Sequence, residues 1–267
     1  MKRASACWKR VLCLALDFAA AVALLAHAGC ARRPIERVEW TTMGTVAAVQ
    51  VRGGGAAAVR SVVQAAFEDV RREFDAHDPE SAIRRLGGCT DFGRPCHDCA
   101  LRLKEASGGA FDPYWRRDGR LDYGAIAKGF AVDVAAARLA SAIPEGQDVL
   151  IDLGGNVKAV RGDWRVGVRG TSGDGVCETV DLKEGESLAT SALYFRGRHI
   201  CDARTGEPVD NDVESVTVRC DSAMEADGLS TALFVLGVDA GRELLVRFAP
   251  GASAFFVLAD GSSVWVR

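Results

Sequence analysis

The chain has 267 residues, of which 48% are hydrophobic and 26% are charged, and its formal net charge is −3 at pH 7. This length and composition are sufficient for a full hydrophobic core, and they exclude intrinsic disorder and fibrous repeats. The mildly acidic charge also argues against nucleic-acid binding, because proteins that hold a phosphate backbone present a basic surface.

The first 29 residues have the pattern of a lipoprotein-type export signal. Basic residues at positions 2, 3, 9 and 10 precede an apolar run over 11–26, which ends at Ala28-Gly29-Cys30. We therefore expect cleavage before Cys30, acylation of its sulfur, and a mature domain over residues 30–267 that is exported and held on the extracytoplasmic face of a membrane. An uncleaved membrane anchor is the alternative. Cleavage would leave 29 basic against 35 acidic residues, a net charge of −6.

Six cysteines follow Cys30 in the mature chain. An even number of cysteines outside the cytoplasm makes disulfides plausible, although the sequence does not define their pairing. Cys96 and Cys99 have the C-x-x-C spacing of half a zinc site or of a redox motif. A structural zinc ion usually takes four ligands, and the chain has no second C-x-x-C, so a disulfide or an incidental pair is favoured.

The mature chain alternates between strand and helix patterns without a linker. Residues 37–51 predict a strand, apolar residues at three- and four-residue steps predict a helix over 59–74, and the Gly- and Cys-rich stretch 87–99 predicts a loop. A second helix is predicted over 124–142, a third over 223–237 and a short one near 239–247. The remaining predicted strands cover 148–153, 164–169, 176–182, 187–195 and 213–220, and a hairpin turns at Asp260-Gly261. This order predicts an α+β domain.

Two predicted helix starts carry polar residues suited to anions or metals. Asp122 precedes the second helix and Lys128 follows one turn later, which is typical of a phosphate site or of ordinary capping beside a solvated lysine. Asp227 and Thr231 lie four residues apart on the third helix and share a face. A carboxylate and a hydroxyl in this arrangement can hold Mg²⁺, which fills its octahedron with phosphates or water, although the spacing alone is common.

Two further features have an equally open interpretation. The pair Gly154-Gly155 follows a buried-looking strand and predicts either a turn or a close approach of the backbone to a ligand. His199 is one of three histidines that remain after processing, and a lone histidine is more often structural than catalytic.

Taken together, the polar segments resemble the successive signatures of the ApbE family, the flavin transferases that move FMN from FAD onto a Thr or Ser of a target protein. The resemblance spans about residues 38–258, and its specific parts are LDYGAIAKG at 121–129 and ADGLSTALF at 226–234. Weaker matches, in chain order, are MGT at 43–45, AFDP at 110–113, IDLGGN at 151–156, LATS at 188–191 and RHICDARTG at 198–206. The family's fold is an α+β fold of mixed sheets and packed helices, with the FAD site between lobes.

The resemblance implies a role for each matching residue. Positions that contact FAD would be Met43, His77, Ala110, Phe111, Asp112, Asp122 and Lys128. The Mg²⁺ ligands would be the backbone carbonyl of Ala125 and the side chains of Asp227 and Thr231. His199 would deprotonate the acceptor hydroxyl, which attacks the FMN-side phosphorus of FAD as AMP departs. The implied partners are FAD and an acceptor protein, expected to be a membrane redox subunit.

The chain departs from the family pattern mainly in the flavin pocket. Phe111 and Asp122 are only eleven residues apart, a shorter segment than members carry, so one wall of the pocket would be missing or replaced. His77 stands where many members have Tyr. Two alternatives to the transferase therefore stay open: an FAD pyrophosphatase that yields FMN and AMP, and a flavin-binding lipoprotein without turnover. Retention of Asp227, Thr231 and the other polar residues favours chemistry over binding alone.

Overall fold

The computed structural model describes residues 33–116, 118–170, 175–193 and 200–267. Cys30, with the rest of the expected signal segment, and His199 lie outside these residues. Residues 35–267 form one compact unit. Within the described part of the chain, no helix combines the length and the apolar character that crossing a membrane requires.

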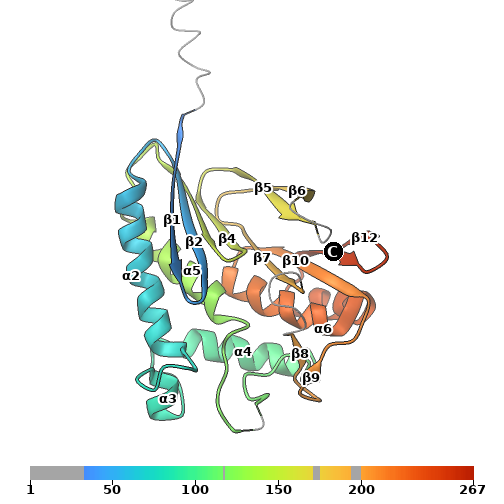
Figure 1. Cartoon of the computed structure of the whole chain (residues 1–267). Helices are drawn as coiled ribbons and strands as arrows, with labels where there is room; N and C mark the ends of the chain where they lie inside the picture. The colour runs from blue at the N-terminus through green and yellow to red at the C-terminus, as the bar shows by residue number, and fades with distance from the viewer. Residues whose placement is uncertain (1–32, 117, 171–174, 194–199) are drawn as a thin grey trace, which may run out of the picture. The chain divides into compact units, whose positions relative to one another are not determined.

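An eight-stranded antiparallel sheet forms the centre of this unit (Figure 1). Its strands, in spatial order, are β1 (Ile35–Thr42), β2 (Thr45–Arg52), β3 (Asp148–Leu153), β4 (Asn156–Arg161), β7 (Ser187–Ala192), β10 (Val213–Cys220), β11 (Ser253–Leu258) and β12 (Ser263–Val266). Strands from both ends of the unit thus share one sheet. Together with the packed helices, this arrangement confirms the expected α+β class.

Two tight turns each connect a pair of neighbouring strands in the sheet. The single strand predicted over 37–51 is wrong: Met43 and Gly44, with φ of 47° and 69°, make a two-residue hairpin turn between β1 and β2. Positive φ at both central residues is the geometry that matches the twist of paired strands. Gly154 and Gly155, with φ of 60° and 91°, form the equivalent turn between β3 and β4, so this glycine pair is a turn.

Three long helices cover one face of the sheet: α2 (Ala56–Phe74), α5 (Ala127–Ala140) and α6 (Ala223–Phe248). Their apolar sides, including Phe67, Leu139 and Phe234, pack with inward residues of β2 and β3 into the main core. The two helices predicted over 223–237 and 239–247 form one element interrupted at Gly237, whose φ of 75° and ψ of −174° are not helical.

A smaller core covers the opposite face of the sheet. There the hairpin of β5 (Trp164–Arg169) and β6 (Val176–Leu182) packs Trp164 and Leu182 against Leu150, Val157 and Phe255. Two short bridges, β8 (Cys201–Asp202) and β9 (Glu207–Pro208), follow β7 in the chain. Both faces of the central sheet are therefore covered.

The loop predicted over 87–99 is partly wrong, because α4 (Arg94–Ala106) begins inside it, after the short α3 (Ala82–Leu86). Cys96, Cys99, Ala100 and Leu103 are buried along one side of α4, and this helical period is masked in the sequence by the glycines before it. The six described cysteines form no disulfide with one another, so the disulfides that their even number makes plausible are not found among the described residues. Burial raises the pKa of the Cys99 thiol to about 11, which leaves it protonated at neutral pH.

Candidate functional site

A cavity of about 790 Å³ lies where the sheet meets the N-terminal ends of α5 and α6. This volume is within the usual range for sites that bind small ligands. Ten of the residues assigned from the sequence line it: Met43, His77, Ala110, Phe111, Asp112, Asp122, Ala125, Lys128, Asp227 and Thr231. These come from separate parts of the chain, which the fold brings together. Their individual roles stay predictions.

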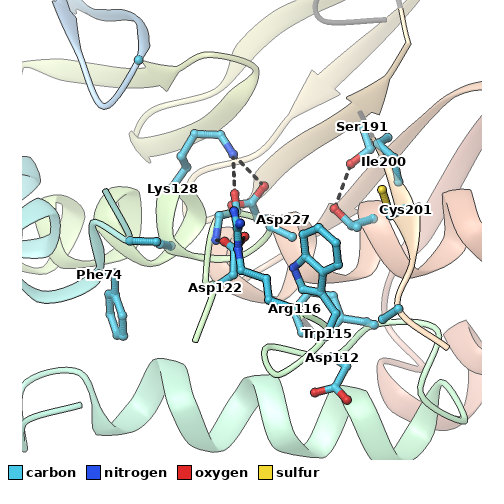
Figure 2. A pocket seen from close by; sticks show the side chains of 18 of the residues that line it. Phe74, Asp112, Trp115, Arg116, Asp122, Lys128, Ser191, Ile200, Cys201 and Asp227 are labelled. Atoms are coloured by element: carbon cyan, nitrogen blue, oxygen red, sulfur yellow. Dashed lines mark hydrogen bonds and ion pairs between the residues drawn. The ribbon is translucent and has the colours of Figure 1, made fainter. Parts of the chain in front are cut away.

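Asp227 is a buried carboxylate that joins α5 to α6. Its side chain is only 7% exposed, and its Oδ2 accepts the backbone N–H of Gly129 at 2.9 Å. Its Oδ1 lies 3.5 Å from Nζ of Lys128. Figure 2 marks this ion pair with a dashed line. A buried carboxylate needs such partners, because removing an unpaired charge from water is costly. The result is a fixed anionic group at the cavity wall, beside a cation on the neighbouring helix.

The position of this carboxylate depends on unusually close helix packing. A Cβ atom added to Gly129 would lie 2.2 Å from the carbonyl oxygen of Ala223 and 2.7 Å from Cβ of Asp227. No side chain fits in this space, so Gly129 is required where α5 approaches the first turn of α6. The glycine also donates the N–H that holds Asp227.

A set of hydroxyl groups connects Thr231 to the sheet. Thr231 Oγ1 lies 3.2 Å from Ser191 Oγ on β7, and Ser191 Oγ lies 2.8 Å from Ser230 Oγ. Ser230 in turn donates to the backbone carbonyl of Asp227 at 2.9 Å. Thr231 and Asp227 therefore face one cavity, as the four-residue spacing predicts, and Ser191 in the LATS segment orients the threonine hydroxyl.

Asp122 does not cap α5, and the capping expectation is wrong. The helix begins at Ala127, five residues later, and the N–H groups of Ile126 and Ala127 bond instead to the carbonyl of Tyr123. Asp122 accepts the N–H of Gly124 at 2.9 Å through Oδ1 and the Nε–H of Arg116 at 2.8 Å through Oδ2. The carboxylate thus fixes the turn before the helix and an arginine in the cavity wall.

This turn is anchored to α4 by a contact that the sequence does not reveal. Tyr123 is fully buried, its ring lies 4.5 Å from that of Phe74, and its hydroxyl lies 2.6 Å from Nδ1 of His97. Burial raises the pKa of the Tyr123 hydroxyl, which stays protonated. Cys96-His97-Asp98-Cys99 therefore supports the site through its histidine. Among the described residues no group of three or more His, Cys, Asp or Glu side chains is placed to hold a metal.

Trp115 and Arg116 also line the cavity, and sequence reasoning missed both. They lie in the short segment between Phe111 and Asp122. The neighbouring Asp112 forms an ion pair with Lys104 at 2.8 Å. The signal that could have identified the two residues was the Trp-Arg pair itself, in a short segment that was expected to leave one wall of the pocket missing or replaced.

The described residues that line the cavity carry charges of both signs. Among the residues that the structure describes, three basic side chains line the cavity (Arg71, Arg116 and Lys128) against four acidic ones (Asp75, Asp112, Asp122 and Asp227). Hydrogen bonds to Glu68 and Asp78 raise the pKa of Arg71, so its charge is already neutralised locally. Asp227, Thr231 and the Ala125 carbonyl would offer hard oxygen ligands of the kind that Mg²⁺ takes in small number from a protein. The donor set therefore fits Mg²⁺.

Comparison with known proteins gives consistent similarities. Residues 114–256 match the model of the ApbE family. The chain is 31% identical over 270 residues to the FAD:protein FMN transferase of Treponema pallidum, and the alignment covers 91% of this chain and 72% of that protein. It is 37% identical to the FAD:protein FMN transferase of Klebsiella pneumoniae over 146 residues, 51% of this chain and 45% of that protein.

Solved structures show the same fold. The apo flavinyl transferase ApbE of Pseudomonas stutzeri superimposes with a TM-score of 0.73 at 24% identity, over 89% of this chain and 96% of that chain. The ApbE protein of Thermotoga maritima gives a TM-score of 0.76 at 22% identity, over 88% and 97%. At these identities the likeness is one of fold.

Proposed function

Because the chain belongs to the ApbE family, we propose that it is an FAD:protein FMN transferase, like the curated relatives of that name. In the proposed reaction it moves FMN from FAD onto a Thr or Ser hydroxyl of an acceptor protein and releases AMP. The observation that carries the proposal is the placement of Lys128, Asp227 and Thr231 at the wall of a single cavity lined by the other residues matched to FAD contacts.

The bond changes in this reaction define what the chain must supply. The acceptor oxygen forms a bond to the FMN-side phosphorus, the bond from that phosphorus to the bridging oxygen breaks, and AMP leaves with that oxygen. A base takes the hydroxyl proton. Catalysis of phosphoryl transfer is mostly positioning and charge stabilisation. Lys128 Nζ lies 3.4 Å from the Gly124 carbonyl and 3.5 Å from Asp227, and it would contact a phosphate oxygen near the α5 N-terminus.

We also propose that the site uses Mg²⁺. The ion would be held by Asp227, Thr231 and the Ala125 carbonyl, and it would neutralise charge on the pyrophosphate. The chain's part is to fix these donors in advance: the N–H of Gly129 holds the Asp227 carboxylate, and Ser191 contacts the Thr231 hydroxyl.

One incubation separates the transferase from its alternatives. Purified protein is mixed with FAD, Mg²⁺ and an acceptor that carries a Thr or Ser target, and the products are separated by denaturing gel and chromatography. We expect fluorescent acceptor and one AMP for each flavin transferred. Free FMN and AMP would indicate a pyrophosphatase, and unchanged FAD would indicate a binding protein. An acceptor whose target hydroxyl is replaced by alanine is the control.

His199 is proposed as the base that takes the proton of the acceptor hydroxyl. We expect His199→Ala to slow transfer while the affinity for FAD stays near that of the wild type, because a general base acts on the chemical step. Transfer rates and FAD titrations measured on the same preparation test this. An equal loss of affinity and rate would instead make His199 a binding residue.

Cys30 is proposed as a lipid-modified residue that holds the protein at a membrane on the extracytoplasmic side, where a membrane redox subunit would be within reach as the acceptor. We expect Cys30→Ser to leave the precursor uncleaved or to release the protein from the membrane fraction, because several acyl chains are needed for stable anchoring. Fractionation and mass spectrometry of the mature N-terminus test this. Wild-type protein without a lipid, found in the cytoplasm, would contradict it.

A further inference from the structure

The described residues of the short segment between Phe111 and Asp122 lie in a loop at the cavity wall, and hydrogen bonds hold both of its ends. The N–H of Tyr114 bonds to Oδ1 of Asp112 at 2.8 Å, and the N–H of Trp115 bonds to the Asp112 carbonyl at 3.2 Å. The far end is closed by the N–H of Asp122, which donates to the Pro113 carbonyl at 2.9 Å. These bonds fix the two ends of the loop, and Trp115 and Arg116 between them line the cavity.

Arg116 is held in place beside this indole. Its Nε donates to Asp122 at 2.8 Å, and its guanidinium carbon lies 5.2 Å from the centroid of the Trp115 ring. Figure 2 shows both side chains at the cavity, with Asp122 beneath Lys128. A guanidinium has five N–H donors, and the bond to Asp122 uses only one. The others remain geometrically suited to phosphate oxygens.

Trp115 differs from the phenylalanines of the cavity. Phe74 and Phe111 are only 5% and 4% exposed, and their rings belong to the hydrophobic core. Trp115 is half-buried, lines the cavity and lies outside that core. An indole offers a broad flat face, and aromatic rings stack on one another with a preference for offset arrangements.

We propose that Trp115 is a stacking platform for one of the two flat ring systems of FAD, and that Arg116, positioned by Asp122, faces the pyrophosphate. The inference rests on the proposed function and deepens it, because it gives a ligand-binding role to the part of the cavity wall that the short segment forms. The same loop thus provides a planar contact and a cation on consecutive residues, one for each chemical part of a dinucleotide.

The test compares Trp115→Phe, Trp115→Leu and Tyr114→Leu in the full mature chain. Tyr114 is the matched control, since it lies on the same loop, is 46% exposed and does not line the cavity. Affinity is measured by the change in flavin fluorescence on titration with FAD and FMN, and by competition with ADP. Thermal unfolding is recorded for each variant.

Stacking predicts that Trp115→Leu weakens FAD binding roughly tenfold or more, while Trp115→Phe and Tyr114→Leu stay within about threefold of the wild type. If Trp115→Leu weakens the binding of FMN as well as of FAD, the isoalloxazine stacks on Trp115. If it weakens the binding of ADP as well as of FAD, the adenine stacks there. Either result supports the inference. Equal FAD affinity of the leucine variant and the wild type would overturn it. If the wild type itself binds no FAD, the proposed function fails together with this inference.

Discussion

Replacing Asp227 with alanine is expected to reduce FMN transfer about 10³-fold while FAD still binds. Among the three proposed metal ligands only Asp227 carries a charge, and metal stabilisation of the transition state is worth several kcal/mol. A loss of ~4 kcal/mol corresponds to roughly 10³ in rate. FAD affinity is expected to persist because most of the cavity wall is contributed by other segments, including Met43 and Trp115. Rates are measured across a Mg²⁺ titration, and affinity by flavin fluorescence.

Asp227→Asn distinguishes the effect of losing the negative charge from the effect of losing folding stability. Alanine also removes the acceptor for the buried N–H of Gly129, and an unpaired buried donor costs about 1–3 kcal/mol of folding stability. Asparagine keeps an oxygen for that N–H, so its thermal midpoint is expected near that of the wild type while its rate falls as far as that of alanine. Thr231→Ala is expected to be milder, because water can replace a neutral ligand.

Two results would contradict the metal assignment. One is full activity of Asp227→Asn at saturating Mg²⁺, since the amide lacks the charge that the proposal requires. The other is unchanged wild-type activity after chelation. A rate loss that follows only the thermal midpoint across the three variants would make Asp227 a structural link between α5 and α6.

The elements that could be predicted from the sequence are those with an uninterrupted periodicity. Helix α2 repeats apolar residues at helical spacing along its length, and the β11–β12 hairpin brackets Asp260-Gly261. Helix α4 was missed because Gly93 and Pro95 surround its start, and these residues usually mark loops. The sequence pattern does not predict strand β4, because Gly154-Gly155 marks the end of one strand without showing that a second, antiparallel strand follows directly.

The parts of the candidate site that could be predicted from the sequence are those whose residues lie close together in one short segment. Asp227 and Thr231 are a helical turn apart, so their shared face follows from spacing. The contact of His97 with Tyr123 joins residues 26 positions apart, and the bond of Gly129 to Asp227 joins residues 98 apart. Only the packing of α4, α5 and α6 makes these pairs neighbours, and no local pattern reports it.

Gly129→Ala is expected to lower both stability and transfer. At an ordinary helical position this change would stabilise the protein by up to about 1 kcal/mol, because alanine is the better helix former. Here the new Cβ would meet the Ala223 carbonyl oxygen at 2.2 Å and its carbon at 2.7 Å. These are backbone atoms, so the two helices would have to separate. Overpacking costs about 1–3 kcal/mol and sometimes more, which outweighs the gain in helix propensity.

The matched control is Gly228→Ala, which lies on α6 whereas Gly129 lies on α5. Gly228 is also buried within a helix, but its added Cβ would meet Cδ2 of Leu103 at 2.8 Å and Cδ1 of Ile126 at 3.3 Å, which are the ends of side chains and can shift at lower cost than backbone atoms. We expect Gly129→Ala to lower the thermal midpoint by roughly 5–10 °C, and Gly228→Ala to lower it by less than half of that.

Separation of the helices at Gly129 would also move the N–H that fixes Asp227, so transfer by Gly129→Ala is expected to fall even well below its unfolding temperature. Gly228→Ala keeps that hydrogen bond and is expected to retain most of its activity at the same temperature. The comparison therefore tests whether the approach of α5 to α6, and not the mere presence of Asp227, sets the geometry of the site. Equal activity of the two variants at a temperature where both are folded would show that the carboxylate needs no such support.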